Sequence, residues 1–327
     1  MKAASSMRFC LACAVLLPAA VAASASSWAQ EYPARPIRFI VGFAPGGVAD
    51  LLARGLAQKL TEAWGQQVIV DNRAGAGGLI GMQIAGKSAP DGYTLLMGSS
   101  TQFSINPALR TVPYDPIRDY DPILHAALTP VILTVHPSLP AKSVQDLIKL
   151  AKGKGMSYGS TGFGGAPHIS AELLKRVAGI EITHVPYKGG SAAVTALLGG
   201  HVQASFGAVS TSLPHLRSGR LRALGVTSAK RLAAIPDVPT FVEAGLAGFE
   251  VEQWFGVFAP AGVPPAVKGK LNEALAQAAA SPQLKEHFSS QGVELRGSTL
   301  QAFAAYVKSE LARWTKLVKE LDISETS

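Results

Sequence analysis

The stretch Phe39–Asp50, with the sequence FIVGFAPGGVAD, constrains the fold more than any other part of the chain. It continues an apolar, β-branched run from Ile37 to Val41, which is typical of a buried strand in a parallel sheet. The run stops at Pro45-Gly46-Gly47, and a leucine-rich helical pattern then extends to Trp64. The sequence therefore predicts a strand, a glycine turn and a helix, which together form one unit of an α/β fold.

The start of this predicted helix is a candidate anion site. Backbone N–H groups in the first turn of a helix lack intrahelical partners, and the helix dipole favours a phosphate or carboxylate there. Asp50 lies in the first turn, where the dipole also favours its carboxylate, and it could hold water or the opposite loop. The alternative is an ordinary strand–helix connection with a helix-capping aspartate.

Composition and charge restrict the class of protein. A chain of 327 residues with 48% hydrophobic and 16% charged residues can bury a large core, and its length suggests two domains. Basic residues are scattered and aromatic residues make up only 7%, so we expect no nucleic-acid partner. The formal net charge of +8 favours an anionic small molecule or surface only weakly.

The first 29 residues have the pattern of a secretory signal peptide. Basic Lys2 and Arg8 precede an apolar run, and Ser27-Trp28-Ala29 supplies a small-residue cleavage pattern. We expect cleavage near Ala29 and a periplasmic protein. Both cysteines, Cys10 and Cys13, fall in this segment, so the mature chain would have no disulfide and no thiolate metal site.

Two further polar turns follow predicted strands in the first half. The strand Gln67–Asp71 leads into a glycine-rich turn, Asn72–Gly78, which misses the third glycine of a dinucleotide-binding fingerprint. The strand Tyr93–Met97 leads into the hydroxyl-rich turn Gly98–Gln102. Ligands of open α/β sheets bind beyond the carboxyl ends of strands, so three such turns strengthen the case for a ligand site.

A second strand–turn–helix unit lies in the other half of the chain. The turn Ser160–His168 is rich in glycine and hydroxyl groups, Pro167 suits the first turn of a helix, and Gly179 would end that helix. Two such turns, facing each other across a cleft, could bind both ends of a dianion. The alternative is a turn that is rich in glycine for close packing alone.

The remaining elements are expected as follows. We predict an ordered loop over 106–122, a strand Val131–Val135, and a turn Gly207–Leu213 before a helix around Pro214–Ser218. Ser191 and Ser298 are predicted to cap helices.

Motifs of common catalytic sites are missing, including HExxH, GxSxG, SxxK and Walker A. His168, His184 and His201 could meet in space, and Ser160 with His168 could form a nucleophile–base pair. Nothing in the sequence identifies an orienting acid, however. We therefore expect a binding protein rather than an enzyme, without a cofactor or metal ion.

Several motifs together resemble a known receptor family. They are YPARPIRFIVGFAPGGVADLLAR (Tyr32–Arg54), VDNRAGAGG (Val70–Gly78), PDGYTLL (Pro90–Leu96), HVPYKG (His184–Gly189) and PDVPT (Pro236–Thr240). Their combination and order resemble the periplasmic solute-binding receptors of tripartite tricarboxylate transporters, also called the Bug receptor family. The resemblance extends over nearly all of the chain after residue 29.

The resemblance implies a two-lobed α/β fold of the periplasmic-binding-protein type, type II-like, with a ligand cleft between two Rossmann-like domains. Domain 1 would comprise residues 30–130 and 251–327, and domain 2 residues 131–250. It also implies that a small organic carboxylate is bound largely by backbone amides and waters, and delivered by a monomeric receptor to membrane permease subunits. The ligand-binding positions carried over are Phe43, Ala44, Gly46, Gly47, Asp50, Ser100, Thr101, Ser160, Thr161, Gly162, Gly164, Gly165, His168, Tyr187, Ala208 and Ser212.

The chain departs from the expected family pattern at several positions. At most of them a less polar side chain replaces the polar one that is common in the family. Ala49 replaces a hydroxyl residue, Leu79 an asparagine, and Gln203 and Gly207 replace aspartates. These changes favour a less hydrophilic ligand, such as an aromatic or longer aliphatic acid. Two other functions remain open: a ligand-loaded receptor that acts as a sensory partner of a signalling protein, and an exported hydrolase.

Overall fold

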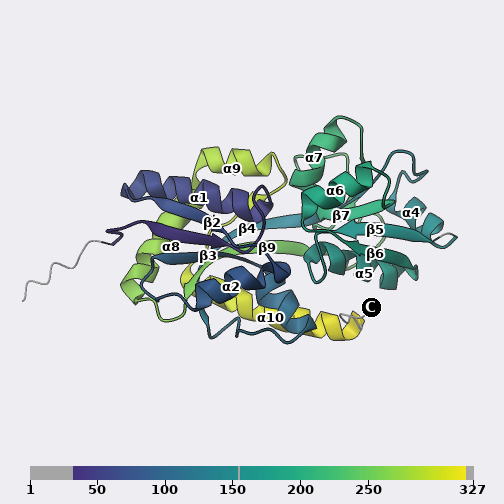
Figure 1. Ribbon diagram of the computed structural model, residues 1–327. Coiled ribbons are helices and arrows are strands. Elements are labelled where there is room, and N and C mark those ends of the chain that lie inside the picture. Colours follow the sequence, from purple (N-terminus) through teal and green to yellow (C-terminus); the bar gives the residue numbers. More distant parts are fainter. Residues whose placement is uncertain (1–31, 154, 322–327) are drawn as a thin grey trace, which may run out of the picture. The chain divides into compact units, whose positions relative to one another are not determined.

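The computed structural model describes residues 32–153 and 155–321, and Figure 1 shows their arrangement. The fold below belongs to the compact unit that begins at Arg35. The predicted signal peptide lies outside the described residues.

The first section of the sheet contains the strand with which the sequence analysis began. β1 (Ile37–Val41) pairs in parallel with β2 (Val68–Asn72) on one side and with β3 (Thr94–Ser99) on the other. β9 (Glu252–Pro260) joins β3 in antiparallel orientation, and β4 (Tyr120–Val135) pairs with β9. The short β10 (Glu294–Leu295) also pairs with β4. The parallel order β2-β1-β3 brings the carboxyl ends of three strands to one edge, as predicted.

The second section of the sheet continues through β4, which changes its partners along its length. Up to Pro130 it pairs with β9, and from Val131 it pairs with β7 (Ala204–Ala208) and β8 (Arg222–Val226). β5 (Met156–Ser160) lies between β7 and β6 (Ile182–Pro186) in parallel orientation to both. One continuous strand therefore belongs to both sections.

Helices cover both faces of each section (Figure 1). Those against the first section are α1 (Val48–Trp64), α2 (Leu79–Gly86), α3 (Asn106–Leu109), α8 (Pro265–Ala280), α9 (Pro282–Ser289) and α10 (Leu300–Leu321), with a 3-10 turn η1 (Ala76–Gly78) and a π-helix η2 (Thr101–Ile105). Those of the second section are α4 (Val144–Ala151), α5 (Ala166–Ala178), α6 (Gly190–Leu198) and α7 (Val209–Arg217).

The core of the first section is built on aromatic stacking beneath α10. Phe103 stacks on Phe258 with ring centroids 3.7 Å apart, and Trp254 packs edge-on against Phe303 at 5.9 Å. The residues Phe303, Val307, Trp314 and Val318 of α10 are buried, at the spacing of one helical face. Buried apolar rings of this size supply much of the hydrophobic stabilisation of the fold.

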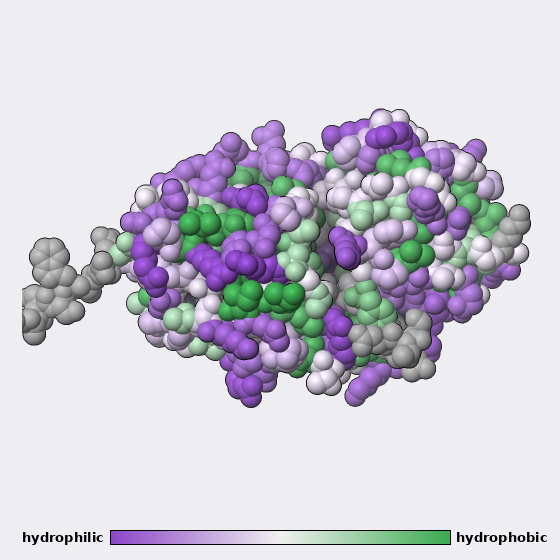
Figure 2. All heavy atoms as spheres, in the orientation of Figure 1, coloured by the Kyte–Doolittle hydropathy of each residue, from purple (hydrophilic) through white to green (hydrophobic). Residues whose placement is uncertain are grey.

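The surface that Figure 2 shows is mostly hydrophilic, with hydrophobic residues in smaller patches. Ile69 on β2 and Ile80 on α2 are among the few large apolar side chains that are exposed. Among the described residues, no helix combines the length and the apolar character that a membrane span requires.

Three sequence-based expectations about secondary structure were wrong. β4 begins at Tyr120 rather than Val131. Pro122 lacks an N–H group, and the strand tolerates it because the register with β9 shifts next to it. The predicted loop contains α3, in whose first turn Pro107 is tolerated. α7 follows β7 directly, and the hydroxyl of Thr211 in its first turn donates to Ala208 O at 2.9 Å.

Two predicted caps are also wrong. Gly189 with a φ of +116°, not Ser191, is the N-cap of α6, and it has no side-chain cap. Thr299 rather than Ser298 caps α10, since Thr299 Oγ1 accepts a hydrogen bond from Ala302 N at 3.1 Å.

We expect the packing of β9 against α10 to depend on Gly256. A Cβ at this position would overlap the Phe303 ring and lie 3.1 Å from Leu124 O. The variant Gly256→Ala should therefore lower the free energy of unfolding by about 2 kcal/mol or more in a denaturant titration. The control is Gly269→Ala in α8, where a Cβ would meet open space, and it should raise stability by about 0.5–1 kcal/mol. Equal effects of the two substitutions would contradict this packing.

Candidate functional site

The first candidate turn joins β1 to α1. Gly46 adopts a φ of +82°, and the N-cap residue Gly47 has an extended backbone with no side-chain cap. The first intrahelical bond runs from Leu51 N to Gly47 O at 3.0 Å, so the N–H groups of Val48 and Ala49 lie outside the helical ladder. The helix start therefore presents donors to an anion, as the sequence predicted.

Asp50 holds this turn in place. Its carboxylate is buried, with 2% of its surface exposed, and accepts hydrogen bonds from Gly46 N at 2.9 Å and Arg54 Nε at 3.0 Å. Its other oxygen accepts from Asn72 Nδ2 at 2.9 Å, and Asn72 also donates to Phe43 O at 3.1 Å. Burial alone would raise the pKa of Asp50, but hydrogen bonds from Arg54, Gly46 and Asn72 outweigh burial and lower that pKa.

Asp50 thus acts as a clamp between the turn and the end of β2, rather than as a cap of α1. Sequence reasoning missed both side-chain partners of this carboxylate. Arg54 could have been found from its i,i+4 spacing to Asp50. Asn72 is separated from Asp50 by 22 residues, so only the register of β1 with β2 brings the two side chains together.

The hydroxyl-rich segment after β3 lies beside this turn. Gln102 Nε2 donates to Gly78 O at 3.2 Å, and a Cβ at Gly42 would lie 2.8 Å from the same nitrogen. Ser100 and Thr101 are the first two residues after β3, and both are buried. The polar ends of β1 and β3 and the start of α2 therefore meet around Gln102.

The second candidate turn joins β5 to α5. Gly162 and Gly164 adopt φ values of +124° and +71°, and Gly165 is an extended N-cap without a side-chain cap. The first bond of the helix runs from Ile169 N to Gly165 O at 3.0 Å. This turn repeats the geometry of the first one, an uncapped helix start that follows glycine residues.

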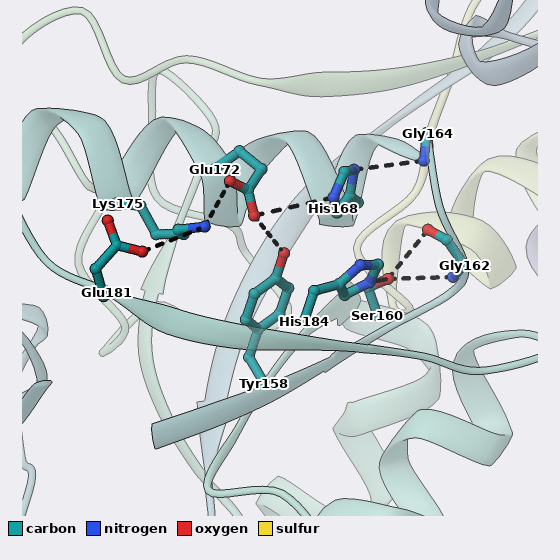
Figure 3. A network of polar contacts seen from close by, with 9 residues as sticks. All are labelled: Tyr158, Ser160, Gly162, Gly164, His168, Glu172, Lys175, Glu181 and His184. Carbon is teal, nitrogen blue, oxygen red and sulfur yellow. Dashed lines mark hydrogen bonds and ion pairs between the residues drawn. The ribbon is translucent and has the colours of Figure 1, made fainter. Parts of the chain in front are cut away.

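Two N–H groups of the second turn are already used within the chain (Figure 3). Gly162 N donates to Ser160 Oγ at 3.1 Å, and Gly164 N donates to His168 Nδ1 at 3.4 Å. Pro167 has no N–H group and so offers no donor to a ligand. Ala166 N, at the first position of α5, is a donor that lies outside the helical ladder.

A partly buried polar network supports the second turn from beneath. Tyr158 OH donates to Glu172 Oε1 at 2.9 Å, and Lys175 Nζ binds the other oxygen of Glu172 at 2.8 Å. His168 and His184 pack with ring centroids 4.3 Å apart, and His184 stacks on Tyr158 at 4.9 Å. As Figure 3 shows, both histidines lie between Glu172 and the glycine turn.

The two histidines of this network have strongly lowered pKa values. Burial, with the neighbouring His184 and Lys175, lowers the pKa of His168 to about 3, and burial with Lys175 lowers that of His184 to about 4. Both rings are therefore neutral at ordinary pH and act as hydrogen-bonding groups.

The pair of Ser160 with His168 that the sequence left open is not formed. Ser160 Oγ lies 2.7 Å from His184 Nε2 instead, and it also donates to Gly162 O at 3.1 Å. With no exposed surface, Ser160 is placed to shape the turn rather than to attack a ligand. His201 does not join the pair: it lies beside Gly199, at the end of α6.

The remaining predicted positions belong mostly to the second turn. Thr161 Oγ1 would lie 3.2 Å from a Cβ at Gly165, and Tyr187 N donates to Ser160 O at 3.1 Å. Ala208 and Ser212 lie at the start of α7, and the Oγ of Ser212 is buried. The structure thus assembles each turn from its predicted residues, while the opposition of the two turns across one crevice remains a prediction.

A surface pocket of about 650 Å³ lies elsewhere, between the segment 107–119 and α10. None of the predicted ligand-binding residues lines it. Among residues 32–153 and 155–321, no group of three or more His, Cys, Asp and Glu side chains is arranged to hold a metal ion.

Comparisons with known proteins agree on one family. Residues 52–323 match the family described as the tripartite tricarboxylate transporter family receptor. Protein BugT of Bordetella pertussis is 38% identical over 299 residues, which is 89% of this chain and 91% of BugT.

Two solved structures are similar over nearly their whole length. R. palustris Rpa4515 with adipate is 37% identical with a TM-score of 0.86, and the alignment covers 90% of this chain and 99% of Rpa4515. The periplasmic binding protein BugD is 33% identical with a TM-score of 0.84, and the alignment covers 90% of this chain and 99% of BugD.

We expect the buried histidines to make stability depend on pH. In the unfolded chain a histidine has a pKa of about 6.5, so below that pH the unfolded state binds protons that folded His168 does not. Stability should therefore fall as the pH falls from about 6.5, by up to about 2 kcal/mol per histidine at pH 5. Denaturant titrations at several pH values would measure this slope.

The variant His168→Gln should have a shallower slope between pH 6.5 and 5, and the exposed His287→Gln should leave the slope unchanged. The lowered pKa of Asp50 changes the free energy of unfolding mainly below about pH 4, so it does not affect the slope between pH 6.5 and 5. An unchanged slope in His168→Gln would show that this ring is charged in the folded protein.

Proposed function

Because the chain belongs to the tripartite tricarboxylate transporter receptor family, we propose that it binds a small organic carboxylate outside the cytoplasm and delivers it to a membrane permease. The family resemblance predicted from the sequence motifs is confirmed. The predicted fold class, a two-lobed α/β fold of the periplasmic-binding type, is confirmed as well.

The sheet supports a division of the chain into two lobes. We propose that residues 30–130 and 251–327 form one lobe and residues 131–250 the other. The change of partners along β4 between Pro130 and Val131 supports the first crossing. The start of β9 at Glu252, which returns the chain to β3, supports the second. Hinged closure of the lobes would enclose the ligand.

The observation that carries the proposed ligand class is the pair of uncapped helix starts at α1 and α5. Each follows glycine residues with positive φ, and each leaves N–H groups outside the helical ladder. The helix dipoles add partial positive charge at both places, so a carboxylate is the favoured ligand. Adipate, the acid in the similar Rpa4515 structure, has one carboxylate at each end.

The site is suited to binding rather than to catalysis. The hydroxyl of Ser160 is engaged with the backbone of Gly162 in its own turn and with His184 Nε2. The ligand would therefore be released unchanged. We further propose export by removal of a signal peptide near Ala29, and a monomeric receptor.

The direct test is native mass spectrometry of the protein purified without denaturation. We expect one molecule of a small organic acid per chain, displaced by excess adipate and chemically intact. Retention of no acid, together with no binding of any carboxylate by calorimetry, would refute the proposed function. Conversion of the acid during incubation would support the hydrolase alternative instead.

Asp50→Ala tests the clamp of the first turn. Loss of the carboxylate removes the acceptor of Gly46 N and one of the two acceptors of Asn72 Nδ2. We therefore expect carboxylate affinity to fall about tenfold or more while the chain still folds. Isothermal titration calorimetry and a thermal melt would measure the two effects.

The matched control for the clamp is Asp121→Ala. The carboxylate of Asp121 also accepts backbone and side-chain hydrogen bonds, from Gly262 N, Val263 N and Lys268 Nζ. It lies at the start of β4, opposite the end of β9. The variant Asp121→Ala should lower the free energy of unfolding and leave the affinity for the carboxylate unchanged. If both variants bind as tightly as the wild type, Asp50 has only a structural role.

A further inference from the structure

The segment from Ser100 to Asn106 contains several buried polar residues, of which only Ser100 and Thr101 belong to the predicted ligand site. It consists of the residue after β3, the π-helix η2 and the first residue of α3. π-Helical turns are rare and are frequent at functional sites. Ser100, Ser104 and Asn106 have at most 1% of their surface exposed, although all three are polar.

Three side-chain atoms of this segment have no hydrogen-bond partner within the described part of the chain. They are Ser100 Oγ, Ser104 Oγ and Asn106 Nδ2. Most buried polar side-chain atoms in proteins are hydrogen-bonded, because an unpaired buried donor costs free energy. Three such atoms in one short segment indicate that the segment is built to meet a polar group that is not part of the chain.

Asn106 lies between two of the glycine turns. A Cβ at Gly164 would be 2.9 Å from Asn106 Oδ1, and a Cβ at Gly77 would be 3.5 Å from Asn106 Nδ2. Both glycines have positive φ, so neither position favours a side chain that would cover the amide. The Oδ1 atom of Asn106 therefore faces the second candidate ligand turn, and its Nδ2 atom faces Gly77 in the turn after β2.

The charge around this amide suits an anion. The guanidinium of Arg110 also lies beside Gly77, since a Cβ added at Gly77 would be 3.4 Å from Arg110 Nη2. Arg110 N also donates to Asn106 O at 3.0 Å, which fixes the two residues one helical turn apart. An amide N–H group next to a cation is a favourable environment for a carboxylate oxygen.

We propose that Asn106 determines specificity by donating a hydrogen bond from Nδ2 to the second carboxylate of a dicarboxylic acid. This inference rests on the proposed function, and it assigns one end of the ligand to a side chain instead of a helix start. The hydroxyls of Ser100 and Ser104 provide further donors along the same segment. A monocarboxylic acid of equal length would leave Asn106 unpaired, and the site would reject it.

The test compares matched acids on matched variants by isothermal titration calorimetry. The probes are adipate against hexanoate, and succinate against butyrate. Wild-type protein should bind at least one diacid about tenfold or more tightly than its monoacid partner. Asn106→Leu, which removes the donor, should abolish most of this preference, with little change for the monoacid.

Asn106→Asp provides the second variant, because it keeps the shape of the side chain and replaces the donor by an anionic oxygen. Diacid affinity should then fall about 100-fold, since two carboxylates would face each other, while monoacid affinity changes by less than about threefold. A thermal melt of each variant without ligand shows whether the fold is intact.

The control is Leu109→Ala in the same helix. Leu109 Cδ1 would lie 3.1 Å from a Cβ at Gly164, so it packs against the same turn without a polar group. It should change the affinities for diacid and monoacid by equal factors. An Asn106 variant that behaves like Leu109→Ala would reduce Asn106 to a packing role and overturn the inference.

Failure of the inference and failure of the proposed function give different results. If the wild type binds diacids and monoacids equally, or if the Asn106 variants keep the diacid preference, Asn106 is not the determinant and the receptor function stands. If the wild type binds no carboxylate at all, both fail.

Discussion

The structure depends on how the chain turns from a buried strand into a helix without a side-chain cap. At the starts of α1 and α5, glycine residues with positive φ allow the reversal, and the first N–H groups of each helix stay outside the helical ladder. Uncapped helix starts cost stability, so each turn needs support from elsewhere. The two supports differ in chemistry.

The first turn is held by charge and the second by neutral rings. Asp50 links Gly46, Arg54 and Asn72, and its lowered pKa keeps it ionised. Beneath the second turn, Glu172 and Lys175 pair with each other. The neutral ring of His168 accepts a hydrogen bond from Gly164 N, and the neutral ring of His184 contacts Ser160 Oγ. A carboxylate ligand near α5 would therefore face neutral rings and N–H groups rather than the carboxylate of Glu172.

Local signals in the sequence predicted much of the fold. The β-branched run of β1, the glycine after α5 and the proline in its first turn gave element boundaries within a residue or two. Elements with conflicting local signals were missed. Pro122 and Pro130 hid the first part of β4, whose pairing with β9 depends on residues more than a hundred positions away. The hydroxyl run before Pro214 concealed the start of α7.

The parts of the candidate site that local sequence signals mark were predictable, and the parts that depend on long-range contacts were not. Glycine and proline mark the two turns locally, so the turns themselves were found. The side chains that support them, Asn72 and His184, meet their partners only through strand register. Asn106 was missed because its contact with Gly164 links segments that are far apart in the sequence.

A crystal structure of the protein with a bound dicarboxylate, such as adipate, tests the central claim most directly. We predict that one carboxylate lies within hydrogen-bond distance of the first N–H groups of α1, and that the acid extends toward the β5–α5 turn. An acid bound in the pocket between the segment 107–119 and α10, away from both helix starts, would contradict it.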